Sequence, residues 1–239
     1  MISRTLNDKS NFGLSAGTRR RLSQIATIAF AVAVALFILT FSIGLPIYIR
    51  PFYYAHIGDV QYADYYGWDY DTMKAAYDEM ITYCTTPGAE FGTGELLYSE
   101  SGASHFADCK SLFTLNWVVF TISGVVIVAT YIIKKMGFID LRRPLGFDVT
   151  FFSSVGLLLT FTVIALLAST DFSAAFTIFH KIFFPGKDNW LFDPRTDQII
   201  LLLPQSFFMD CAILILISIM TLSALFITLG IIRREKAYK

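Results

Sequence analysis

The sequence predicts an all-α membrane protein with four transmembrane helices. Of its 239 residues, 55% are hydrophobic and only 16% are charged, a balance far from that of an average soluble chain. The hydrophobic residues gather in long uncharged runs of about 22 residues or more, and a helix of that length reaches about 33 Å, enough to cross the hydrocarbon core of a bilayer. We place the spanning helices at residues 22–49, 111–133, 149–170 and 207–232.

The charged residues predict how these helices are oriented. The formal net charge is zero, which excludes the basic excess expected of a nucleic-acid-binding protein. Thirteen Lys and Arg against four acids lie in the tails 1–21 and 233–239 and the connection 134–148, which the positive-inside rule places in the cytoplasm. Segments 50–110, with ten acids and three basic residues, and 171–206 are then extracytoplasmic.

Each outer segment contains one further predicted helix, and the first of the two is amphipathic. In the first, Asp71 is the expected N-cap, and we expect the helix to pack on the outer ends of the spans. Its apolar residues recur at helical spacing: Met73, Ala76, Tyr77, Met80, Ile81 and Cys84. In the second, residues 172–184 are nearly all apolar but too short to cross, which favours an interfacial or half-inserted helix. One face of that helix is expected to carry Phe176, Phe179, His180, Phe183 and Phe184.

All three histidines lie in the predicted outer segments, and two of them are candidate catalytic residues. His56 follows an aromatic cluster and is most simply interfacial. His105 and His180 each lie where an outer segment meets the membrane, so both are expected to line one site, where burial favours the neutral imidazole that acts as a base. Asp108, three residues after His105 on the same helical face, is the third candidate and would orient the imidazole ring.

Two further ionisable residues have alternative interpretations. Asp210, in the first turn of the last span, is a second candidate partner for a histidine. Lys110 is a candidate to stabilise an oxyanion, although a lysine that reaches from the interface to water is the simpler interpretation. A metal site competes for the histidines, but their spacing and the lack of a clear third ligand argue against it, so no cofactor is expected.

The cysteines do not predict a nucleophile. The sequence contains no G-x-S-x-G motif, no Gly-rich phosphate loop and no cysteine in a recognisable Cys/His site, which argues against hydrolase, thiol-protease and nucleotide-driven activities. Cys84 and Cys109 both lie in the first outer segment, where an oxidising environment favours a disulfide between them. Cys211 is interpreted as a small apolar residue of the last span.

Two sequence patches and the order of the spans are shared with a known family. The patches are H-x-x-D-x-K at residues 105–110 and F-H-x-x-F-F at residues 179–184, followed by Trp190. Further residues follow in the order typical of the family: Asp193-Pro194, Asp197, Pro204 and Phe207-Phe208. Together they resemble a bacterial family of small integral membrane proteins that includes the lipoprotein intramolecular transacylase of Gram-positive bacteria. Cys109 departs from the family pattern, in which an aliphatic residue is expected.

The resemblance implies a function on bacterial lipoproteins. The sn-2 acyl chain of the diacylglyceryl group would move to the amine of the N-terminal cysteine and leave a lyso-form lipoprotein. His105 and His180 match the two motif histidines of the family, and Trp190 and Asp197 are implied as supporting or substrate-binding residues. The resemblance further implies a membrane-anchored lipoprotein as the substrate, and a bacterial cytoplasmic membrane as the location, with the active site facing outside.

A non-catalytic membrane accessory protein, which binds a partner through its outer domain, is the alternative. The enzyme interpretation requires the rings of His105 and His180 to lie within about 7 Å of each other, allowing for a bridging water. A packed span between the two rings would favour the accessory protein. The sequence predicts no oligomeric state.

Overall fold

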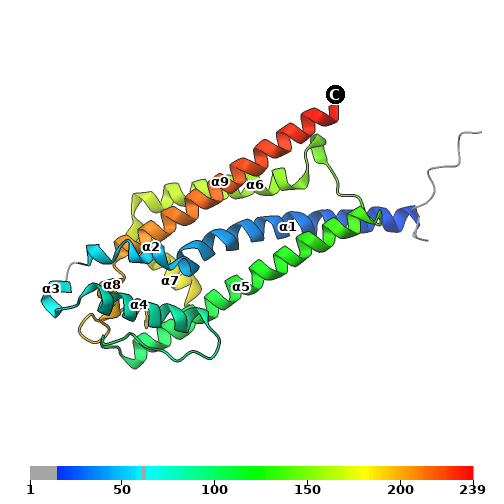
Figure 1. Ribbon diagram of the computed structural model, residues 1–239. Coiled ribbons are helices and arrows are strands. Elements are labelled where there is room, and N and C mark those ends of the chain that lie inside the picture. Colours follow the sequence, from blue (N-terminus) through cyan, green and yellow to red (C-terminus); the bar gives the residue numbers. More distant parts are fainter. Residues whose placement is uncertain (1–14, 61–62, 239) are drawn as a thin grey trace, which may run out of the picture. The chain divides into compact units, whose positions relative to one another are not determined.

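The computed structural model describes residues 15–60 and 63–238, and these residues form helices and no strand (Figure 1). Residues 1–14 of the predicted cytoplasmic tail, and Lys239, lie outside the described residues. The helices in chain order are α1 (Ala16–Tyr48), α2 (Arg50–Tyr54), η1 (Ile57–Asp59), α3 (Ala63–Tyr66), α4 (Tyr70–Thr85), α5 (Glu100–Lys135), η2 (Pro144–Gly146), α6 (Val149–Thr170), α7 (Phe172–Phe183), α8 (Ile199–Leu202) and α9 (Gln205–Tyr238).

Four of these helices, α1, α5, α6 and α9, are long and apolar enough to cross a membrane. In α5 and α6, only 6% of the most hydrophobic stretch is buried inside the protein. Few apolar side chains of these two stretches are therefore fully buried, as expected where lipid rather than water surrounds a helix. The predicted fold class, an all-α membrane protein with four transmembrane helices, is confirmed.

The chain divides into two compact units, which we describe separately. Among the described residues, the first unit contains 15–41, 119–161 and 218–238, and the second contains 42–118 and 162–217. All the candidate site residues named above belong to the second unit.

In the first unit, polar contacts tie the connection between α5 and α6 to its neighbours. Arg19 pairs with Asp140 at 3.0 Å, and Arg233 pairs with Asp148 at 2.9 Å. The amide of Asp140 also donates a hydrogen bond to Ser23 Oγ at 3.0 Å. Because solvent-exposed ion pairs contribute at most about 1 kcal/mol each, these contacts position the connection more than they stabilise the fold.

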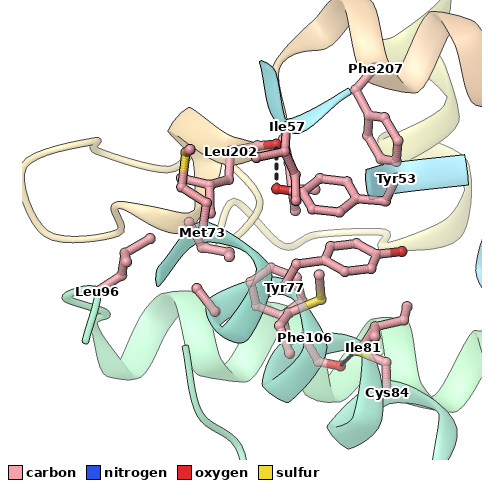
Figure 2. Packing of buried hydrophobic residues seen from close by; sticks show 14 of the residues in the cluster. Tyr53, Ile57, Met73, Tyr77, Ile81, Cys84, Leu96, Phe106, Leu202 and Phe207 are labelled. Carbon is pink, nitrogen blue, oxygen red and sulfur yellow. Dashed lines mark hydrogen bonds between the residues drawn. The ribbon is translucent and has the colours of Figure 1, made fainter. Parts of the chain in front are cut away.

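The second unit has a hydrophobic core built around α4. All six residues predicted for the apolar face of this helix are buried. Tyr53 of α2 stacks on Tyr77, with ring centroids 3.6 Å apart, and donates a hydrogen bond to the carbonyl of Leu202 in α8 (Figure 2). The amphipathic helix therefore packs against α2 and α8 and forms the centre of this unit.

The start of α4 differs from the prediction. Its N-cap is Asp69, whose carboxylate accepts a hydrogen bond from the amide of Thr72 at 2.8 Å. Asp69 has the extended backbone that an N-cap requires, whereas Asp71 already lies in the first turn of the helix. The expectation that Asp71 is the cap is therefore wrong by two residues.

The residues predicted to share one face of α7 differ in burial. Asp171 caps the helix by accepting a hydrogen bond from the amide of Ala174 at 2.9 Å. His180 and Phe184 are buried, but Phe179 and Phe183 are 46% and 49% exposed. The two buried residues, His180 and Phe184, are four positions apart and so lie one above the other on the same side of the helix. Phe179 and Phe183 lie beside them on an exposed apolar surface.

Candidate functional site

Two histidines from different elements of the second unit lie side by side. His105 lies in the second turn of α5, and His180 lies in the last turn of α7. Their ring centroids are 5.9 Å apart, and the residues are only 5% and 8% exposed. No span separates the rings, so the geometry satisfies the distance that the enzyme interpretation requires.

The hydrogen bonding of His180 determines its tautomer. Its Nδ1 lies 2.8 Å from the carbonyl oxygen of Phe176, one turn earlier in α7. Because a carbonyl only accepts hydrogen bonds, Nδ1 carries a proton, and in the neutral ring Nε2 carries the lone pair. Burial lowers the pKa of His180, and the ring stacks on Trp190 with centroids 4.6 Å apart. His180 thus has the properties of a general base at neutral pH.

Aromatic rings surround His105. The edges of Phe184 and Phe192 approach it, with ring centroids 4.9 Å and 5.4 Å from that of the imidazole. Its Nε2 lies 3.5 Å from the sulfur of Cys109, four residues later in α5. Its Nδ1 is buried and has no hydrogen-bond partner. One nitrogen of this ring is therefore left without a fixed role.

The sequence suggested that Asp108 contacts the ring of His105. In the structure its carboxylate contacts a loop instead. One carboxylate oxygen pairs with Lys187 at 2.5 Å, and the other accepts a hydrogen bond from the side chain of Asn189 at 3.0 Å. Lys187 and Asn189 were not candidate site residues in the sequence. They follow Pro185-Gly186, and only this turn, whose glycine has φ +72°, hints that the chain reverses here.

Asp197 lies against the N-terminus of α5 rather than against the histidine pair. Its buried carboxylate accepts hydrogen bonds from the amide and the hydroxyl of Ser99, and from the hydroxyl of Thr196, each at 2.9 Å. A Cβ on Gly102 would collide with the same carboxylate, so this close approach requires glycine. Asp197 therefore fastens the segment before α8 to the start of the helix that carries His105.

The structure does not place Asp210 or Lys110 beside the histidine pair. Asp210 lies 3.3 Å from Nε2 of His56, whose Nδ1 is bonded to the carbonyl of Phe52. The ammonium group of Lys110 lies 4.2 Å from the ring centroid of Tyr83 and donates a hydrogen bond to the carbonyl of Ala89 at 3.4 Å. The sequence could not show which histidine Asp210 would face.

The cysteines are free thiols, so the expected disulfide between Cys84 and Cys109 is not present. The Cys84 thiol donates to the carbonyl of Phe106 at 3.8 Å, while Cys109 faces His105. Burial raises the pKa of the Cys84 thiol to about 12. The expectation that no cysteine lies at a histidine is also wrong: Sγ of Cys109 lies 3.5 Å from Nε2 of His105, because residues four apart share a helical face.

These features define the class of protein as a four-span integral membrane protein with a buried histidine pair. Within the described residues, no group of three potential metal ligands converges. A family model, described as the lipoprotein intramolecular transacylase Lit, matches residues 28–208. The chain belongs to this family.

Solved structures show the same relationship. The chain is similar to the membrane-integral lipoprotein intramolecular transacylase Lit from Bacillus cereus, with 26% sequence identity and a TM-score of 0.78, over 92% of this chain and 99% of that one. Two variants of the Bacillus cereus protein, each with one histidine replaced by arginine or by alanine, are similar at 25% identity with TM-scores of 0.73. The similarity covers 92% of this chain in both cases, and 95% and 96% of the two variant chains. A comparison with curated proteins found no match.

Proposed function

We propose that this protein is a lipoprotein intramolecular transacylase. It moves the sn-2 acyl chain of a diacylglyceryl-modified lipoprotein to the α-amine of its N-terminal cysteine and releases the lyso-form lipoprotein. The observation that carries the proposal is the pair of buried imidazoles 5.9 Å apart, one of them held as a neutral base, in a chain of this family. Two such groups match a reaction that needs one proton removed and one proton returned.

In the proposed reaction, His180 acts first. Its Nε2 takes the proton from the amine while the nitrogen attacks the ester carbonyl carbon, and a tetrahedral intermediate forms. The C–O bond to glycerol then breaks, and the leaving oxygen takes a proton from the histidine pair, so the imidazoles end in their starting state. His105, at 5.9 Å, is close enough to share the proton through the substrate or one water.

No protein nucleophile is needed, because donor and acceptor belong to one substrate molecule. Holding the ester and the amine together supplies an effective concentration that contributes about 7–11 kcal/mol to lowering the barrier when the groups are well oriented. The remaining tasks are to position the lipid and to move protons. In the proposal, Trp190 and Phe176 hold the ring of His180, and Asp108 and Asp197 fasten the surrounding loop.

The surface of α7 supports action on a lipid. Ile178, Phe179, Ile182 and Phe183 are between 46% and 65% exposed, while His180 of the same helix is buried. A helix with one apolar exposed face lies at the boundary between acyl chains and headgroups. His180, on the buried face of α7, is then at the depth of the ester that reacts. By the positive-inside rule this site faces outside, in agreement with the four acids against thirteen basic residues of the predicted cytoplasmic segments.

The experiment that tests this function is expression in a bacterial host that lacks lipoprotein N-acylation. Mass spectrometry of the N-terminal lipopeptide is expected to show one acyl chain on the cysteine nitrogen and one on glycerol. Fragment ions place each chain, so the test does not depend on total mass. A lipopeptide with both chains on glycerol and a free amine would overturn the proposal.

A further inference from the structure

Two complementary polar atoms beside the histidine pair are buried without partners. They are Nδ1 of His105 and Oδ1 of Asn189. A ring nitrogen can donate and an amide oxygen can accept, so each atom could satisfy the other. Because buried polar groups are nearly always paired, two such orphans on neighbouring side chains require an explanation.

The other contacts of Asn189 fix which way its amide points. Its Nδ2 group donates to Asp108 at 3.0 Å and to the hydroxyl of Ser104, the residue before His105, at 3.4 Å. Lys187 holds the other oxygen of Asp108 at 2.5 Å and keeps that carboxylate charged. With both amide protons directed to these acceptors, only the oxygen of Asn189 remains without a partner. The two acceptors, Ser104 and Asp108, lie on either side of His105 in α5, so Asn189 packs against the part of the helix that carries the ring.

We propose that Asn189 is a positioning residue that sets the tautomer of His105: its Oδ1 accepts the Nδ1 proton of the ring and leaves the lone pair on Nε2. A shift of the loop after Pro185-Gly186 would complete this hydrogen bond, which the structure does not contain. His180 follows the same scheme, with the carbonyl of Phe176 in place of the amide oxygen. Both imidazoles then hold a proton on Nδ1 and use Nε2 for chemistry.

The consequence for catalysis rests on the proposed function. When His105 binds a second proton during turnover, Oδ1 of Asn189 still accepts from Nδ1 and stabilises the cation. A reversed amide would direct its NH₂ group at the ring and favour the opposite tautomer, with the lone pair on the wrong nitrogen. The Lys187–Asp108 pair opposes that reversal because it requires a donor at Asp108.

The tautomer can be measured without activity. In the full-length protein labelled with ¹⁵N-histidine in detergent, ¹⁵N chemical shifts separate protonated from unprotonated ring nitrogens. We expect His105 in the native protein to carry its proton on Nδ1, and Asn189→Ala to lose that preference. Asp188→Ala is the matched control, because its side chain is exposed on the same loop. A native His105 with its proton on Nε2 would overturn the proposal, whether or not the protein is a transacylase.

Kinetics provide the second measurement. Asn189→Ala is expected to lower kcat by about 10–100-fold, the usual effect of removing an orienting partner, with little change in KM. Asn189→Ser keeps a small polar side chain and serves if the alanine variant fails to fold. Asp108→Asn together with Asn189→Ala is expected to cost little more than Asn189→Ala alone, because both act through one hydrogen bond. An unchanged kcat in both Asn189 variants, with an unchanged His105 spectrum, would contradict the assignment.

Discussion

Replacing Asp197 tests whether its carboxylate has a structural or a catalytic role. The Asp197 side chain accepts hydrogen bonds from the amide and hydroxyl of Ser99 and from Thr196, at the N-terminus of α5. It also benefits from the positive end of the helix dipole. Asp197→Ala removes at least two hydrogen bonds to a charged acceptor, at about 1.5 kcal/mol each or more, so we expect a loss of about 3 kcal/mol. For a chain of this size that lowers the unfolding temperature by about 6–12 °C.

The assay is thermal unfolding in detergent, measured alongside acyl transfer. Asp193→Ala is the matched control: this carboxylate pairs with Arg195, which is 86% exposed, so its removal should leave the unfolding temperature nearly unchanged. Asp197→Ala is expected to lose stability and activity together, because the loop that carries Phe192 toward His105 is released. A variant that unfolds at the native temperature but has no activity would refute the structural role and assign Asp197 to the substrate.

Three further predictions concern pH, the second histidine–carboxylate pair and orientation. Burial lowers the pKa of His180 from its ordinary 6.5, so its base form persists at pH 6.5 and the rate of acyl transfer should fall only at lower pH. A fall in rate centred above pH 6.5 would contradict this prediction. Asp210→Asn should change kcat less than tenfold, since Asp210 faces His56, and a loss of about 100-fold or more would place it in the catalytic machinery. Tyr65→Cys, at an 82% exposed position, should react with an impermeant maleimide added to intact cells, while the exposed Met136→Cys should react only after lysis; the reverse pattern would invert the topology.

The fold could be predicted because a bilayer imposes simple demands on a sequence. Four uncharged runs of spanning length are enough to define four transmembrane helices. The apolar face of α4 was equally predictable, since spacing alone places residues on one side of a helix. Its cap was less so: Asp69 and Asp71 are both good N-cap residues, and only the backbone of the folded chain distinguishes them.

The candidate site was predictable in its centre and not in its surroundings. His105 and His180 each lie at a junction between a predicted outer segment and an apolar helix, and that shared position indicated that they meet. The partner of Asp108 could not be read in this way. Lys187 and Asn189 reach it through an irregular loop, which has no periodicity to reveal the direction of a side chain.

The most direct test of the histidine pair uses purified protein and a synthetic diacylglyceryl-cysteinyl peptide, with mass spectrometry to follow the acyl chain from glycerol to nitrogen. His105→Ala and His180→Ala are each expected to slow the transfer by about 100-fold or more, the usual contribution of a general acid or base. His56→Ala, whose ring faces Asp210 instead, is the control and should retain most of the native rate. Full native rates in both His105→Ala and His180→Ala would contradict the proposed catalytic role of the histidine pair.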